Sequence, residues 1–146
     1  MNLNKFTIQK SFAISAGAGS GKTYTLSRRY INAILGFDFF REKGFDDIYY
    51  ENLKPATTKQ IVTITYTEAA ALEMKERIFG LISKILMVDS LEDKDGDKES
   101  ILEAFKALND QQKSYVIETL QQALVQSSDS KISTIHSFCL DILTIL

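Results

Sequence analysis

A glycine-rich stretch near the N-terminus limits the possible folds of this chain more than any other part of the sequence. Residues 16–23 read Ala-Gly-Ala-Gly-Ser-Gly-Lys-Thr; apolar residues 12–14 precede them, and a helix-like segment, 24–35, follows. A strand, a glycine-rich turn and a helix in this order form the context of a phosphate-binding loop. The strict motif begins with glycine, and Ala16 is the tolerated alternative. We therefore predict that the loop binds a nucleoside triphosphate, the alternative being an ordinary glycine-rich turn with a chance Gly-Lys-Thr.

The residue types of this loop suit the chemistry of phosphate binding. Its glycines let the backbone approach a phosphate closely, where a Cβ atom would obstruct it. The loop N–H groups form an anion nest, to which the following helix adds its partly positive N-terminus. We expect Lys22 to reach the β- and γ-phosphates and to stabilise their charge in the transition state, and the Thr23 hydroxyl to bind Mg²⁺. The candidate nucleotide-binding residues of the loop and its helix are Ala16, Gly17, Ala18, Gly19, Ser20, Gly21, Lys22, Thr23 and Tyr24.

Length and composition predict about one globular domain. The 146 residues are 45% hydrophobic and 25% charged, a balance that supports a core. The single cysteine, Cys139, cannot form an internal disulfide, which suits a reducing, cytoplasmic setting, and we interpret it as a small buried hydrophobe. We expect no membrane span, because no apolar run approaches ~20 residues. The net charge of −2 gives no basic footprint for nucleic acid.

Hydrophobic periodicity predicts alternating strands and helices. Three short apolar or β-branched segments are predicted strands: 11–16, 60–65 and 131–135. Five amphipathic or apolar segments are predicted helices: 21–35, 68–87, 98–108, 111–126 and 136–146. Gly36 is expected to end the first helix and Thr67 to cap the second. The order of these elements predicts an α/β fold in which a short parallel sheet is flanked by helices.

The connections between these elements are also informative. Residues 37–59 are rich in aromatic side chains, and we expect an irregular connection with at most one short helix, packed on the core by Phe37, Phe39, Phe40, Phe45, Tyr49 and Tyr50. Residues 89–99 are acidic and are expected to form a solvated, mobile loop. Its Asp93–Asp97 part resembles a calcium loop only superficially, because the ligand spacing and the terminal Glu are missing.

Two features indicate a longer protein. The last predicted helix is so apolar that it should pack against something C-terminal to it, and three strands are few for a doubly wound sheet. The alternative is a terminal helix folded back over the core. A phosphate-binding NTPase also normally has a second apolar strand ending in Asp, often followed by a catalytic Glu. The nearest match, 85–89, continues a helical pattern and is followed by Ser90.

Three segments together resemble one family. The loop at 16–23 is the first. The second, 61–78, reads Ile-Val-Thr-Ile-Thr-Tyr-Thr-Glu-Ala-Ala-Ala-Leu-Glu-Met-Lys-Glu-Arg-Ile and resembles motif Ia of UvrD-like superfamily 1A helicases. The third, 133–139, reads Ser-Thr-Ile-His-Ser-Phe-Cys and resembles motif Ib. Their detailed form resembles the RecB/AddA branch, the motor subunits of bacterial helicase–nucleases that process double-strand breaks.

This resemblance implies a P-loop NTPase (RecA-like) fold, with residues 1–146 as the N-terminal part of the RecA-like ATP-binding domain 1A. It implies ATP and Mg²⁺ as cofactors, single-stranded and duplex-end DNA as substrate, and a helicase–nuclease partner subunit. The Asp-Glu motif, the arginines that contact the γ-phosphate and the second RecA-like lobe would lie beyond Leu146, so the fragment alone is expected to be inactive. Gln9 stands where this branch often has a glutamine that reads the adenine edge; an exposed polar residue is the alternative.

The resemblance also assigns motifs Ia and Ib to single-stranded DNA. Hydroxyls and free N–H groups at a strand end and helix start can hold phosphates, and an aromatic ring can stack on a base. The family usually has Phe where this chain has Tyr66. The alternative for His136 is a residue of a helix N-terminus satisfied by local hydrogen bonds. The candidate DNA-contacting residues are Thr65, Tyr66, Thr67 and His136.

Two functions of other classes stay open at this point. A stand-alone P-loop kinase would need a lid that carries arginines, and the chain has only Arg28, Arg29, Arg41 and Arg77, with no cluster. A non-catalytic nucleotide-binding interaction domain would fit a decayed site, but a decayed site usually loses its lysine, and Gly21-Lys22-Thr23 is intact.

Overall fold

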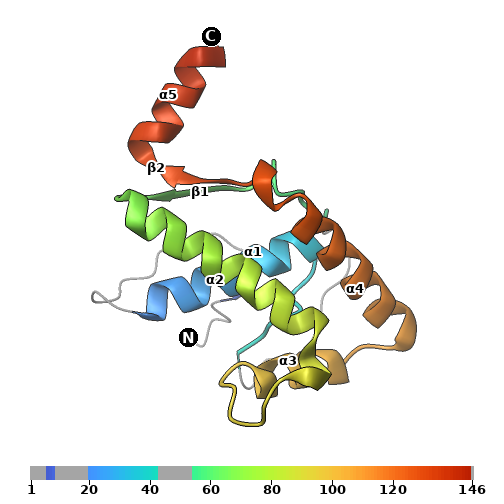
Figure 1. Cartoon of the computed structure of the whole chain (residues 1–146). Helices are drawn as coiled ribbons and strands as arrows, with labels where there is room; N and C mark the ends of the chain where they lie inside the picture. Colours follow the sequence, from blue (N-terminus) through green and yellow to red (C-terminus); the bar gives the residue numbers. More distant parts are fainter. Residues whose placement is uncertain (1–5, 9–19, 43–53, 146) are drawn as a thin grey trace, which may run out of the picture.

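The described part of the chain alternates helices and strands in the predicted order. The computed structural model describes residues 6–8, 20–42 and 54–145, so the predicted strand at 11–16 lies outside it. The principal elements are α1 (Ser20–Leu35), β1 (Val62–Thr65), α2 (Glu68–Leu86), α3 (Lys98–Lys106), α4 (Asp110–Val125), β2 (Lys131–Thr134) and α5 (Ile135–Ile145) (Figure 1). Two short 3₁₀ turns, η1 (Val88–Ser90) and η2 (Ser127–Asp129), follow α2 and α4. The predicted helices and the two predicted strands within the described residues are therefore confirmed, with small shifts at their ends.

The two strands form a parallel sheet. Val62 lies opposite Lys131, and the register continues to Thr65 opposite Thr134. Parallel strands need a long crossover connection, and here α2, α3 and α4 supply it. The described structure is thus α/β with a short parallel sheet, in agreement with the sequence.

Gly36 ends α1 for two physical reasons. Its φ is +80°, a left-handed conformation that is costly for residues with a side chain. A Cβ atom at this position would also lie 2.8 Å from the backbone nitrogen of Pro55. The predicted role of this glycine is confirmed.

The N-terminus of α2 is fixed by Thr67, as predicted. The Thr67 hydroxyl accepts a hydrogen bond from the backbone N–H of Ala70 at 3.0 Å. Glu68 in the first turn and Lys84 in the last turn complement the helix dipole. One face of the helix is buried in the core, through Ala71, Met74, Ile78, Phe79, Leu81, Ile82 and Ile85.

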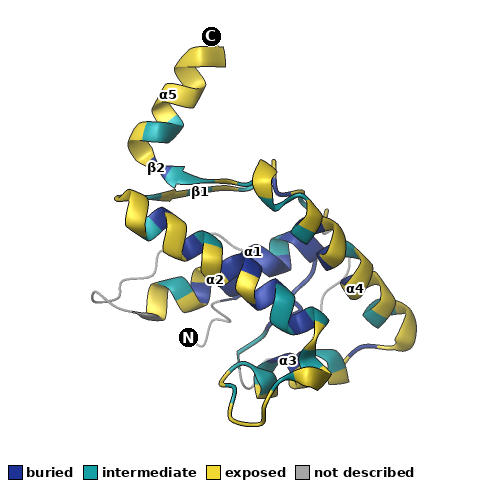
Figure 2. Ribbon diagram, viewed as in Figure 1, coloured by how far each residue is buried: buried dark blue, intermediate teal, exposed yellow. Residues whose placement is uncertain are grey.

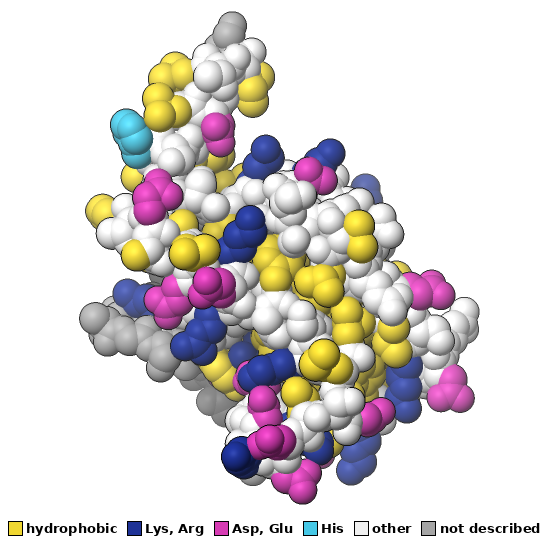
Figure 3. All heavy atoms as spheres, viewed as in Figure 1, with side chains coloured by type: hydrophobic (Ala, Val, Ile, Leu, Met, Phe, Trp, Pro, Cys, Tyr) yellow, Lys and Arg dark blue, Asp and Glu magenta, His cyan; other side chains and the backbone are white. Residues whose placement is uncertain are grey.

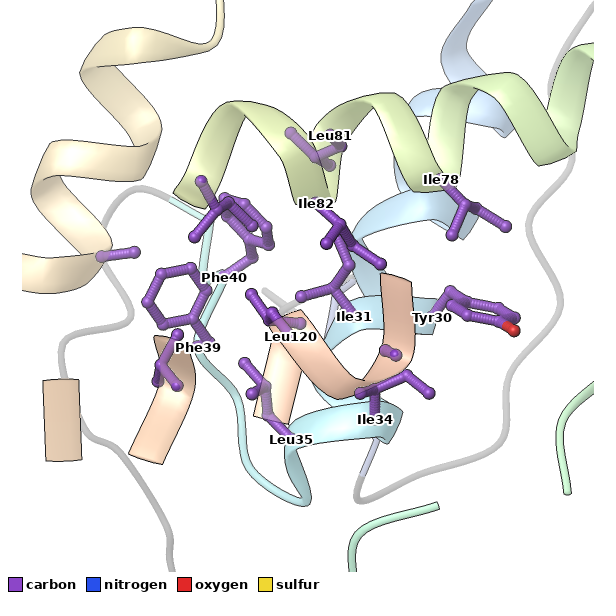
Figure 4. Packing of buried hydrophobic residues seen from close by; sticks show 14 of the residues in the cluster. Tyr30, Ile31, Ile34, Leu35, Phe39, Phe40, Ile78, Leu81, Ile82 and Leu120 are labelled. Carbon is purple, nitrogen blue, oxygen red and sulfur yellow. The ribbon is translucent and has the colours of Figure 1, made fainter. Parts of the chain in front are cut away.

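The hydrophobic core lies between α1, α2 and α4, with α3 closing one end (Figures 1 and 2). Ile31, Ile82 and Leu120 are completely buried and meet in its centre (Figure 4). Burying one such side chain stabilises the fold by about 1.5–3 kcal/mol. The core is therefore built mainly by helices.

The aromatic connection after α1 packs on this core. Phe39 contacts Phe40 and Phe105 edge-to-face, with ring centroids 5.0 and 5.2 Å apart, and Phe37 is also buried. The burial of Phe37, Phe39 and Phe40 confirms the expectation for these residues, whereas Phe45, Tyr49 and Tyr50 lie outside the described residues. The described parts of this connection, 37–42 and 54–59, contain no helix.

Asn32 joins α1 to two other segments from inside the core. Its side chain is fully buried. The amide nitrogen donates to the carbonyl oxygens of Phe6 and Phe40, at 2.8 and 3.0 Å. The amide oxygen accepts from the backbone N–H of Phe40 at 2.9 Å. One side chain thereby satisfies three main-chain groups in segments that precede and follow the helix.

The acidic loop after α2 is held by ion pairs, although the sequence predicts that it is mobile. Lys84 lies 3.1 Å from Asp95 and 3.0 Å from Asp97. The buried guanidinium of Arg28 in α1 donates to Asp97 at 2.9 Å and stacks on the Tyr24 ring at 3.5 Å. These contacts connect α1, the end of α2 and the start of α3. Cations of this chain therefore engage the carboxylates of Asp95 and Asp97.

Stability is expected to fall in acid because of Asp97. Its burial raises the pKa of the carboxyl, but hydrogen bonds from Lys84 and Arg28 outweigh this effect, so the net pKa is lower than the usual 3.8. A carboxyl with a lowered pKa contributes stability above its unfolded pKa and loses it as the pH falls through the folded pKa. Urea unfolding should therefore show a decrease in the free energy of unfolding as the pH drops below 3.8.

The matched variant for this prediction is Asp97→Asn. It should be less stable at pH 7, because the buried Arg28 loses its anionic partner. It should also lose less stability than the wild type as the pH is lowered from neutrality through the range in which this carboxyl titrates. An equally steep acid loss in both proteins would contradict the role assigned to this carboxylate.

Helix α5 projects from the body and has no buried residue (Figures 1 and 2). It is not folded back over the core, and Figure 3 shows hydrophobic side chains exposed along it. The interpretation of Cys139 as a buried hydrophobe is wrong: this residue is exposed, because no described element covers α5. Its exposed apolar side chains are Ile135, Leu140, Ile142, Leu143 and Ile145. No helix in the described parts of the chain has both the length and the apolar composition of a membrane span.

Candidate nucleotide and DNA sites

The C-terminal end of the predicted phosphate-binding loop forms the first turn of α1. Helix α1 begins at Ser20 and has no acidic residue in its first turn. Lys22 is exposed, and no carboxylate of the described residues pairs with it. A Cβ atom added to Gly21 would meet nothing within 4 Å. Among the described residues, this end of α1 therefore combines a helix N-terminus with an exposed lysine and no pairing carboxylate, a combination that attracts anions.

Thr23 and Tyr24 differ in their surroundings. Thr23 is half-buried, whereas Tyr24 is 43% exposed. The Tyr24 ring packs against Phe6, with centroids 5.8 Å apart, and against the guanidinium of Arg28. Contacts within the chain therefore already hold the Tyr24 ring. The remaining candidates of this site, Gln9, Ala16, Gly17, Ala18 and Gly19, lie outside the described residues.

A cavity of about 350 Å³ lies between α1, α2 and β1. Its α1 lining starts at Leu26 and continues through Tyr30 to Ala33, about one to three helical turns beyond Lys22. The Tyr30 hydroxyl is buried without a hydrogen-bond partner among the described residues, and its burial raises the pKa of Tyr30 to about 12.

The candidate DNA-contacting residues come together at one edge of the sheet. Parallel pairing places Thr65, at the end of β1, beside Thr134, at the end of β2. Tyr66 and Thr67 follow the first strand, and His136 lies in the first turn of α5. Segments about seventy residues apart in sequence are thereby adjacent (Figure 1).

The side chains at this edge differ in their capacity to bind a ligand. The Thr65 hydroxyl lies 3.2 Å from the Thr67 carbonyl and 3.4 Å from the Ser133 carbonyl, so its proton is used internally. The Thr67 hydroxyl accepts from Ala70, which leaves its proton available to a phosphate. The Tyr66 side chain is 95% exposed, and His136 is also exposed. Thr67, Tyr66 and His136 therefore retain groups for an external partner.

Sequence reasoning missed one set of contacts at this edge. The Glu68 Oε1 atom lies 3.3 Å from both the Thr134 hydroxyl and the Ser137 hydroxyl. These two hydroxyls lie 3.1 Å apart, and the Ser137 N–H donates to the Thr134 hydroxyl at 3.1 Å. The signal that could have indicated them is the Glu of the Thr-Glu-Ala-Ala sequence, directly after the candidate DNA-contacting residues.

Comparison with known proteins then identifies the family. The UvrD/REP helicase N-terminal domain matches residues 3–145. The chain belongs to this family. A subunit of an ATP-dependent helicase/nuclease from Clostridium botulinum (strain Hall) is 33% identical over 138 residues, which are 94% of this chain and 8% of that protein. The RecBCD enzyme subunit RecB of Buchnera aphidicola subsp. Schizaphis graminum is 28% identical over 144 residues, 98% of this chain and 11% of that protein.

Membership of the UvrD/REP helicase N-terminal domain family confirms the resemblance found in the sequence. The chain spans about a tenth of the length of these relatives. No group of acidic, histidine or cysteine side chains within the described residues has a geometry that would hold a metal ion. Thr23, the Mg²⁺-binding candidate of the sequence analysis, lies within the described part of the chain.

Proposed function

We propose that this chain is the N-terminal part of the RecA-like domain 1A of an ATP-dependent DNA helicase that works in a helicase–nuclease. Residues 1–146 would carry helicase motifs I, Ia and Ib on a P-loop NTPase fold. The family match across residues 3–145 is the observation that carries this proposal. It also favours the helicase over the stand-alone kinase and the interaction domain.

The nucleotide role is supported by the first turn of α1. This turn offers backbone N–H groups, the exposed cation of Lys22 and open space at Gly21, and no described carboxylate opposes an anion there. These residues fit a triphosphate, with Lys22 near the β- and γ-phosphates and Thr23 as a Mg²⁺ ligand. Bound Mg²⁺ would supply charge neutralisation for phosphoryl transfer. Gln9 and residues 16–19 would complete the site with Ser20, Gly21 and Tyr24.

The DNA role belongs to the edge formed by the ends of β1 and β2. Thr67 keeps a hydroxyl proton for a phosphate oxygen, and Tyr66 exposes an aromatic ring on which a base can stack. His136 stands beside them at the start of α5. Single-stranded DNA would cross this edge, with Thr65 holding the strand ends together.

The whole protein would hydrolyse ATP to move along single-stranded DNA during the repair of double-strand breaks, together with a partner subunit. The general base and the arginines that contact the γ-phosphate would come from parts of the protein outside this chain. The relatives support the assignment of these groups to other parts of the protein, because the relatives are helicase/nuclease subunits many times longer than the chain.

Calorimetric titration of Mg-ATP into the chain tests the nucleotide role. We expect saturable binding of one nucleotide per chain. Removal of Mg²⁺ with EDTA should weaken this binding at least tenfold, about 1.4 kcal/mol, because the Thr23 hydroxyl would lose the ion that joins it to the phosphates. Absence of saturable binding with Mg²⁺ present would contradict the proposal.

A further inference from the structure

Glu68 occupies an unusual position between the two candidate DNA-contacting segments. It is the first residue of α2, directly after Tyr66 and Thr67. Its carboxylate nevertheless reaches the hydroxyls of Thr134 and Ser137, which belong to β2 and α5. It therefore bridges two segments that are more than sixty residues apart in sequence.

Elimination limits the directions of the hydrogen bonds in this group. The Ser137 N–H donates to the Thr134 oxygen, so the Thr134 proton is directed elsewhere. A carboxylate only accepts, whereas each hydroxyl has one proton to give. The Thr134 hydroxyl therefore donates to Glu68 or to the Ser137 hydroxyl, and in the second case the Ser137 hydroxyl donates to Glu68. In either arrangement Glu68 accepts a proton from this pair of hydroxyls. Thr134 is 5% exposed, so loss of the carboxylate would leave the Ser137 hydroxyl as the one acceptor among the described side chains for its proton.

The bridge matters most for the direction of α5. This helix has no buried residue and leaves the body at the end of β2, so packing fixes it weakly (Figure 2). Thr134 and Glu68 accept hydrogen bonds from Ser137 in its first turn, and these bonds orient that turn. His136 lies in the same turn. Its position relative to Tyr66 and Thr67 thus depends on the Glu68 carboxylate.

We propose that Glu68 is a positioning residue, which fixes the segment 133–137 against the segment 65–67 so that both contact one strand of DNA. This inference rests on the proposed DNA function. Its consequence is counter-intuitive, because removal of a negative charge ordinarily strengthens binding to a polyanion. Here loss of the carboxylate should weaken DNA binding.

Fluorescence anisotropy with a labelled oligothymidylate provides the test. Glu68→Ala should lower the affinity about tenfold, because the two segments no longer hold one arrangement. The matched control is Glu73→Ala, which removes the same charge from an exposed position on α2 and should leave the affinity equal or slightly increased. Glu68→Gln keeps an acceptor oxygen and should retain most of the wild-type affinity.

Amide hydrogen exchange at Ser137 shows whether the Glu68 substitution loosens the first turn of α5, independently of its effect on DNA binding. In Glu68→Ala, faster exchange of this amide together with weakened DNA binding would support the proposal. DNA binding by Glu68→Ala as tight as that of Glu73→Ala, with or without faster exchange, would overturn it. If the wild-type chain does not bind the oligonucleotide, the proposed DNA function fails, and the positioning role fails with it.

Discussion

Lys22→Ala should lower the affinity of the chain for Mg-ATP at least a hundredfold, which corresponds to about 2.7 kcal/mol. The ammonium group stands in the first turn of α1, where no described carboxylate neutralises it, so its full charge is available to the phosphates. Charge-assisted hydrogen bonds to phosphate oxygens are among the strongest that a side chain makes. Calorimetric titration of Mg-ATP into the variant and the wild type measures the difference.

The fold of this variant should be unchanged, because Lys22 is exposed and does not belong to the core. Circular dichroism and the urea midpoint should match those of the wild type. Lys59→Ala is a suitable charge control, since Lys59 is exposed and its ion pair with Asp129 is long, at 4.0 Å. Equal loss of affinity in both variants would show that the lysine acts through net charge and would remove it from the nucleotide site.

Asn32→Ala should cost about 3–5 kcal/mol of unfolding free energy. The substitution leaves three buried main-chain groups without their partner: the carbonyls of Phe6 and Phe40 and the N–H of Phe40. An unsatisfied buried polar group costs about 1–3 kcal/mol, while a whole domain of this size is stable by only about 5–15 kcal/mol. Urea denaturation followed by circular dichroism measures the loss, and the lack of a cooperative transition would also agree with it.

A second variant separates the donor and acceptor roles of this side chain. Asn32→Asp keeps the oxygen that accepts from Phe40 but brings a second oxygen toward the Phe6 and Phe40 carbonyls, so it should be at least as destabilising as Asn32→Ala. Gln121→Ala, at an exposed position of α4, should change stability by less than about 0.5 kcal/mol. A loss below about 1 kcal/mol for Asn32→Ala would contradict the role given to this residue.

The elements that sequence reasoning predicts well are those with strong local signals. Thr67 caps α2 and Gly36 ends α1, since both act on neighbouring backbone whose chemistry does not depend on the rest of the fold. The parallel pairing of β1 with β2 is likewise predictable from two short β-branched segments joined by helices. Local patterns also indicate the motif residues at the start of α1 and at the sheet edge.

What the sequence does not predict are contacts made at long range by ordinary polar residues. Asn32 and Arg28 have the pattern of common helix residues, yet their partners lie in other segments of the fold. The Glu68 bridge is of the same kind, because its partners follow α2, α3 and α4 in the chain. The interpretation of Cys139 is wrong for the opposite reason: its residue type suggests burial, but the position of α5 exposes it.

Strand β1 is synthesised well before β2, the strand with which it pairs. About seventy residues separate each residue of β1 from its partner in β2, so the ribosome must add α2, α3 and α4 before the pairing is possible. At 5–20 residues per second this takes roughly 4–14 s. During that interval the backbone groups of the nascent β1 that β2 later satisfies lack this partner. Slow translation through α3 and α4 would lengthen this period, in which chaperone binding or aggregation competes with folding.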